Sequence, residues 1–114
     1  MAVVALNTFK TIRIGLTTSN VGIYTCPIGV ATIILLAQVT NVSTDNNTYS
    51  VTASHSRAST DFKFANGLVI PPNDSANLLP DGKLVLETND IIKFSANQIN
   101  KLELILSVLE TAKQ

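Results

Sequence analysis

The stretch TIILLAQVTNV, from Thr32 to Val42, is the most apolar run of the chain and decides its fold class. As a strand it has apolar side chains on both faces, namely Ile33, Leu35, Ala37 and Val39 on one and Ile34 and Leu36 on the other. Such a strand is expected to be covered on both sides near its start. A membrane-spanning helix needs about 20 apolar residues, and polar residues interrupt the uncharged region around this run. We therefore predict a buried strand and no membrane partner.

Alternating patterns on both sides of this run predict further strands. Thr11 to Thr17 alternates apolar and polar residues, and Tyr49 to His55 has one apolar face and one face lined with hydroxyl groups. The turn residues Asp45, Asn46 and Asn47 precede the second of these, so it is expected to fold back as a hairpin. Further short strands are expected at Ile23 to Thr25, Asp61 to Phe64, Gly67 to Ile70, Leu84 to Leu86 and Ile91 to Ser95.

The segment Leu102 to Leu109 fits two patterns. Leu102, Ile105, Leu106 and Leu109 have helical spacing, whereas Leu102, Leu104, Leu106 and Val108 have the spacing of a strand. We favour the strand, because the turns that recur about every ten residues before it indicate a sandwich that a final strand would complete.

These elements predict an all-β fold, an antiparallel β-sandwich of about seven to eight short strands, either jelly-roll-like or immunoglobulin-like. With 114 residues the chain is expected to form one domain over residues 1–114. Residues 1–10 are expected to form an N-terminal arm or an extra strand.

The composition limits the classes of partner. Apolar residues make up 46% of the chain and charged residues only 14%, with eight basic and eight acidic side chains. A surface with this balance does not attract nucleic acid or anionic membranes, but it allows close contact between protein subunits. The first residues lack the basic start of a secretory signal, so synthesis in a cytoplasm is expected.

No residue pattern predicts catalysis, a cofactor, a metal site or a small-molecule substrate. His55 is the single histidine, and a core or interface role is expected for it because a catalytic triad needs a defined nucleophile and orienting group beside the base. Cys26 is the single cysteine and is expected to be a buried small side chain, since it has no partner for an intramolecular disulfide.

The segment IYTCPIG, from Ile23 to Gly29, followed by the apolar strand, resembles a pattern in small structural proteins of tailed bacteriophages, especially those of marine cyanobacteria. Segments similar to Phe64 to Ile70, PPND at residues 71–74 and KLVLE at residues 83–87 recur in those proteins before a terminal strand. Thr88 to Asp90 departs from the Gly-Asp turn common there, and Ile28 stands where a small or polar residue is usual.

The resemblance implies a non-enzymatic β-sandwich protein of the virion that packs against copies of itself and other virion proteins. A peripheral tail or baseplate component is the first interpretation, and a capsid decoration protein is the alternative. A receptor module that binds carbohydrate is a third interpretation. The chain has no tryptophan on which a sugar ring could stack, which disfavours this interpretation. The candidate interface residues are apolar side chains on the second faces of two strands: Ile105, Leu109, Ile34 and Leu36.

Overall fold

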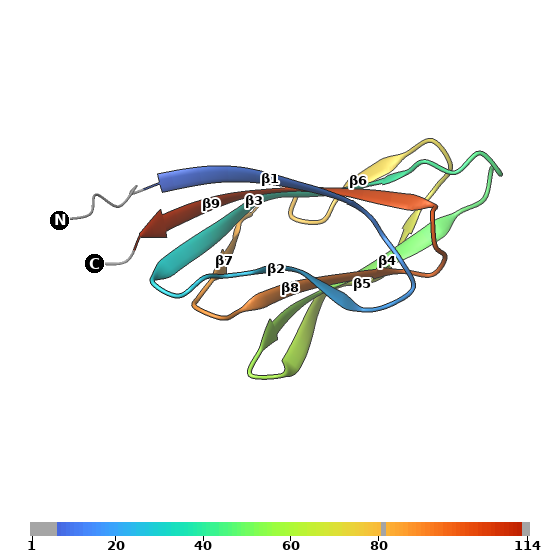
Figure 1. Ribbon diagram of the computed structural model, residues 1–114. Helices are drawn as coiled ribbons and strands as arrows, with labels where there is room; N and C mark the ends of the chain where they lie inside the picture. Colours follow the sequence, from blue (N-terminus) through green and yellow to red (C-terminus); the bar gives the residue numbers. More distant parts are fainter. Residues whose placement is uncertain (1–6, 81, 113–114) are drawn as a thin grey trace.

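The computed structural model describes residues 7–80 and 82–112, which form nine strands and no helix (Figure 1). In chain order they are β1 (Asn7–Gly15), β2 (Val21–Thr25), β3 (Val30–Asn41), β4 (Tyr49–Arg57), β5 (Thr60–Ile70), β6 (Ser75–Asn77), β7 (Leu84–Leu86), β8 (Ile91–Ala96) and β9 (Leu102–Ala112). Within the described ranges there is accordingly no helix of the length and hydropathy that a membrane crossing requires.

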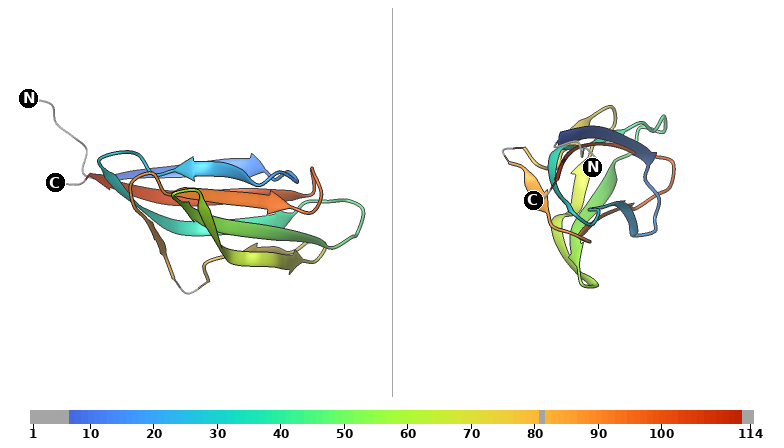
Figure 2. Two further views of the ribbon diagram at one scale, coloured as in Figure 1. Left: turned by 90° about the horizontal axis from the view of Figure 1, so that it is seen from below. Right: turned by 60° about the vertical axis from the view of Figure 1, so that its left-hand side comes forward.

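The strands form two antiparallel sheets that pack face to face (Figures 1 and 2). Sheet A has the order β1-β9-β3-β6, with β7 also paired to β3, and sheet B has the order β2-β8-β4-β5. Since β6 and β7 pair with successive parts of β3, they take the place of one interrupted strand. The resulting order of eight strand positions is that of a jelly roll. The predicted all-β sandwich is confirmed, and its topology is the jelly roll rather than the immunoglobulin fold.

Several predicted elements differ in detail. The C-terminal segment is a strand, as favoured, and it lies in the middle of sheet A. The two short strands expected at residues 61–64 and 67–70 form one strand, β5, because Gly67 has a φ of 63° that keeps the chain paired to β4 through a register shift. Strand β6 was not predicted, since its three residues show no alternation. Of the expected N-terminal arm, residues 7–10 form the start of β1, and residues 1–6 lie outside the described residues.

A β-bulge in the long apolar strand reverses which side chains face the core. In β3, Ile34 pairs with Val108 and Leu36 with Ser107, so Leu35 is an extra residue without a direct partner in β9. Before the bulge the buried positions are Thr32 and Ile34, and after it they are Ala37, Val39 and Asn41. The predicted division of this strand into two uniform faces was therefore wrong, because it assumed unbroken alternation.

The inner faces of the two sheets form the core. The predicted inner residues of the last strand, namely Leu102, Leu104, Leu106 and Val108, are all at most 1% exposed. Opposite them in sheet B lie Val51, Ala53, Ile92 and Phe94, each fully buried. The ring of Phe64 packs edge-on against that of Phe94 and ties β5 to this core.

Candidate assembly surface

The outer face of sheet A carries a row of apolar side chains that crosses four strands. In the strand register Phe9 pairs with Leu109, Leu109 with Ile33, and Ile33 with Val85. Residues paired directly across antiparallel strands point to the same face, so these four side chains form a continuous row. Phe9 is 72% exposed and Val85 is 55% exposed, while the two between them are half-buried.

Two more apolar side chains extend this surface along the strands. Leu36 pairs with Ser107, and Ile105 pairs with Arg13 and with Gln38. These pairings place Leu36 and Ile105 on the same face as the row. The outer apolar face thus consists of Phe9, Ile33, Leu36, Val85, Ile105 and Leu109. In Figures 1 and 2, no element of the described chain lies over the outer side of β1, β9 and β3. This surface is therefore open to a partner.

The charges on this face are few and of opposite sign. Among the outward positions paired in the strands of sheet A the ionisable side chains are Arg13 on β1 and Glu103 on β9, and neither has an ion-pair partner within residues 7–80 and 82–112. The other positions beyond the apolar ones carry hydroxyl, amide or small side chains. Another protein can cover a face of this kind with a small desolvation penalty, because few charged groups are removed from water.

The outer face of sheet B is different. On β4 this face carries the predicted hydroxyl residues, of which Ser50 and Thr52 are half-buried and Ser54 and Ser56 are buried by their neighbours. Beside them Lys93 forms an ion pair with Asp61 at 3.2 Å. The two outer faces of the sandwich are thus chemically distinct, and among residues 7–80 and 82–112 only that of sheet A presents a row of large apolar side chains.

The structure brings together three of the four predicted interface candidates. Ile105, Leu109 and Leu36 share the outer apolar face. Ile34 does not: it is 1% exposed and points into the core, because the bulge at Leu35 separates the faces of two residues that an unbroken strand would place together. Three members of the face were not predicted, namely Phe9, Ile33 and Val85, since only the pairing of β1, β3 and β7 with their neighbours places them in the row.

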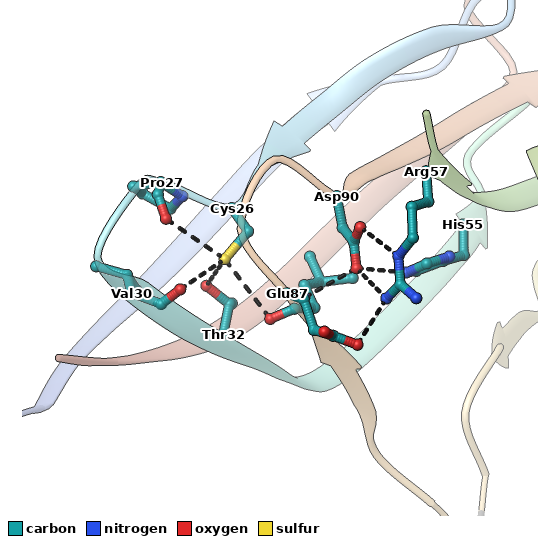
Figure 3. Close-up of polar contacts among 9 residues, drawn as sticks. Cys26, Pro27, Val30, Thr32, His55, Arg57, Glu87 and Asp90 are labelled. Atoms are coloured by element: carbon teal, nitrogen blue, oxygen red, sulfur yellow. Dashed lines mark hydrogen bonds and ion pairs between the residues drawn. The ribbon is translucent and has the colours of Figure 1, made fainter. Parts of the chain in front are cut away.

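A buried carboxylate organises one end of sheet B (Figure 3). The side chain of Asp90 is 1% exposed and accepts two hydrogen bonds from Arg57, from Nε at 2.8 Å and from Nη2 at 2.6 Å. It also accepts the backbone N–H of Glu87 at 2.8 Å and lies 3.0 Å from Nε2 of His55. The Arg57 guanidinium, above all, holds the pKa of Asp90 well below its usual range. His55 is thus part of a structural cluster that joins β4 to the turn before β8.

A chain of polar contacts links the two sheets near this cluster. Tyr24 of β2 donates its hydroxyl hydrogen to Glu110 of β9, and its oxygen lies 2.8 Å from the hydroxyl of Thr32 of β3. Burial, followed by the bond to Glu110, raises the pKa of Tyr24. Lys10 of β1 closes the chain with an ion pair to Glu110 at 3.1 Å. Side chains of β3 and β9 therefore hold the edge strand β2, and Lys10 of β1 pairs with one of them.

Cys26 extends this chain from the corner after β2. Its thiol is fully buried and lies 3.3 Å from the carbonyl oxygen of Val30 and 3.3 Å from the hydroxyl of Thr32. The backbone of Cys26 is bonded to the turn before β8, because its N–H donates to the carbonyl oxygen of Asp90 at 2.9 Å. The predicted burial of this cysteine is confirmed.

We expect replacement of Cys26 by alanine to leave assembly unchanged in reducing and oxidising buffer. Alanine fits the site and removes only weak thiol hydrogen bonds, so the free energy of unfolding should fall by about 1 kcal/mol. Cys26→Ser serves as the matched control, because its hydroxyl can donate to Val30 and accept from Thr32. Size-exclusion chromatography with and without reductant provides the measurement. If the natural chain loses its assembly on addition of reductant, a purely structural role of Cys26 is contradicted.

Comparison with known proteins gives similarity in fold alone. No protein-family model and no curated protein matches the sequence. Among solved structures, a chain in the acid-stable capsid of Helicobacter pylori bacteriophage KHP30 is similar with a TM-score of 0.59 and 11% identity, covering 98% of this chain and 92% of that one. A chain from Bacillus endospore appendages, described as disulfide-linked pili, is similar with a TM-score of 0.52 and 12% identity, covering 99% and 98%.

Proposed function

We propose that this chain is a structural protein of a bacteriophage particle that acts by packing against copies of itself and other virion proteins, without catalysis. The observation that carries the proposal is the outer apolar face of sheet A. An isolated domain gains nothing from keeping Phe9 and Val85 largely in water, whereas full burial of such a side chain contributes about 1.5 to 3 kcal/mol.

The comparisons support this proposal at the level of fold. The two chains reported above come from protein assemblies, a phage capsid and a pilus, and each is matched over nearly its whole length. The resemblance of the corner at Cys26 and Pro27 to proteins of tailed phages, and of marine cyanophages in particular, points the same way. Localisation in the virion is part of the proposal.

Within the particle, a peripheral tail or baseplate component is our first candidate. The sequence resembles proteins of tailed phages, and the outer apolar face of sheet A offers a surface on which neighbouring subunits can pack. The likeness to a chain of a phage capsid favours the second candidate, a decoration protein on the capsid surface.

Separation of heads and tails from purified particles of the parent phage distinguishes these candidates. Mass spectrometry and immunogold labelling should detect the chain in the tail fraction, at a stoichiometry that fits a ring of subunits. Detection in the head fraction would replace the first candidate by the second. If the chain is found in infected cells but in neither fraction, the proposal of a virion protein is overturned.

A further inference from the structure

We infer that two copies of this chain pack through their outer apolar faces, related by a twofold axis that runs parallel to the strands between β9 and β3. This deepens the proposed function by naming the first partner in assembly as a second copy. In this arrangement each cross-strand row lies on the same row of the partner in reverse order. Phe9 then faces Val85 of the other copy, and Leu109 faces Ile33.

The apolar row suits this symmetry because its exposed side chains stand at its two ends. The most exposed, Phe9 and Val85, lie on the outer strands β1 and β7, and the half-buried ones lie on the central strands. Reversal therefore places each exposed side chain against the exposed side chain at the other end of the row. Interfaces between two copies about a twofold axis require a surface that is complementary to itself in this way.

The charges of the face also fit a second copy. Arg13 lies on the outer strand, in the row of Ile105, Gln38 and Asn77, so reversal of that row brings it to the amide of Asn77. Glu103 lies on β9 in the row of Thr40 and is brought to that hydroxyl. Neither Arg13 nor Glu103 is thus placed opposite a charge of its own sign, and the chain as a whole has no net charge to oppose association.

The size of the face is sufficient for a dimer. With eleven residues in β9, sheet A is about 37 Å long, and four strands span about 19 Å, which gives a footprint of about 700 Å². Stable protein interfaces bury about 600 to 1,000 Å² on each partner, and the footprint lies within this range. Two sheets packed in this way keep their strands nearly aligned, as the sheets of a sandwich do.

A charge-swap experiment tests the pairing directly. Size-exclusion chromatography with light scattering should show the natural chain as a dimer at micromolar concentration. Phe9→Lys and Val85→Glu should each weaken the dimer by at least roughly 30-fold, because each places an unpaired charge against an apolar side chain of the other copy. The double variant carrying both changes should regain the dimer, because each new lysine faces a new glutamate of the other copy. Within one chain these two positions lie on the outermost strands of the sheet, so an internal ion pair cannot explain the recovery.

Phe62→Lys is the matched control, since Phe62 is 73% exposed but belongs to sheet B. It should leave the dimer intact, and circular dichroism should show all four variants folded. The inferred interface is overturned if the natural chain is monomeric, if Phe62→Lys dissociates the dimer equally, or if the folded double variant stays monomeric. If the chain is found in the virion but is monomeric in solution, the inferred interface is refuted and the proposed function stands. If the chain is a dimer in solution but is absent from the particle, the proposed function is refuted and the interface stands.

Discussion

Replacement of Leu104 by alanine should lower the free energy of unfolding by about 2 to 5 kcal/mol, because it leaves a cavity between the two sheets. Leu104 is 1% exposed, and in the strand register it lies between Ile14 and Val39 on the inner face of sheet A. On both sides of Leu104 the neighbouring strands are held by regular pairing with β9, so they cannot close the space by moving together. Chemical denaturation of the purified variant, monitored by circular dichroism, measures the loss in the free energy of unfolding.

The adjacent residue provides the matched control. Ile105→Ala removes a similar side chain from the same strand, but Ile105 points to the outer face and is 45% exposed. Its truncation should cost the isolated fold much less than that of Leu104. Equal losses of stability for the two variants, measured at a concentration where the chain is monomeric, would show that both side chains are buried within the fold and would remove Ile105 from the outer apolar face.

Loss of the Asp90 carboxylate should be the second largest single effect, with Asp90→Ala lowering the free energy of unfolding by about 3 kcal/mol. Breaking a buried ion pair by removing one partner typically costs about 3 to 5 kcal/mol. We expect the lower end because the side chain of Arg57 is 53% exposed and can be hydrated once its partner is gone. Asp61→Asn is the matched control, since that carboxylate pairs with Lys93 at the surface, and it should change stability far less. A loss for Asp90→Ala no larger than for Asp61→Asn would contradict the structural role of the buried cluster.

The pH dependence of stability should change with the same residue. Because Arg57 and its neighbours lower the pKa of Asp90 in the folded state, the ionised carboxylate stabilises the fold above the unfolded pKa of about 3.9. This contribution is lost as the pH falls below that value toward the folded pKa. Asp90→Asn should therefore be less stable at neutral pH and lose less stability on acidification. Thermal melts from neutral to strongly acidic pH measure the slope, and parallel curves for the two proteins would exclude this linkage.

The sequence predicted the faces of strands that contain polar residues. In β4 the serines and Thr52 mark the outer face, and in β9 Glu103 and Ser107 do the same, so the inner residues could be named before the structure was known. In β3 the run from Ile33 to Ala37 is entirely apolar, and nothing in it marks where the alternation changes. The bulge at Leu35 was for this reason not predictable, and Ile34 was assigned to the surface.

The candidate surface was predictable only in part for a related physical reason. Ile105 and Leu109 stand out because a strand pattern exposes them, whereas Phe9 and Val85 join them only through the pairing of strands distant in sequence. The buried cluster was missed altogether, because Asn89 and Asp90 have the composition of an ordinary turn. Its signal would have been an arginine in the final position of a strand, which by itself is too common to be specific.

The position of β9 has a consequence for how the chain reaches its folded state. It is the last described strand to be synthesised, yet it lies between β1 and β3 and supplies the hydrogen-bonding partner of both. Sheet A cannot form while the ribosome still holds that segment, so the fold is completed only after β9 has left the ribosome. Closure of a sheet between such distant segments is slow, typically on a scale of milliseconds to seconds. During that interval the long apolar strand β3 lacks its central neighbour, and folding yield should therefore be sensitive to the concentration and temperature at which the protein is produced.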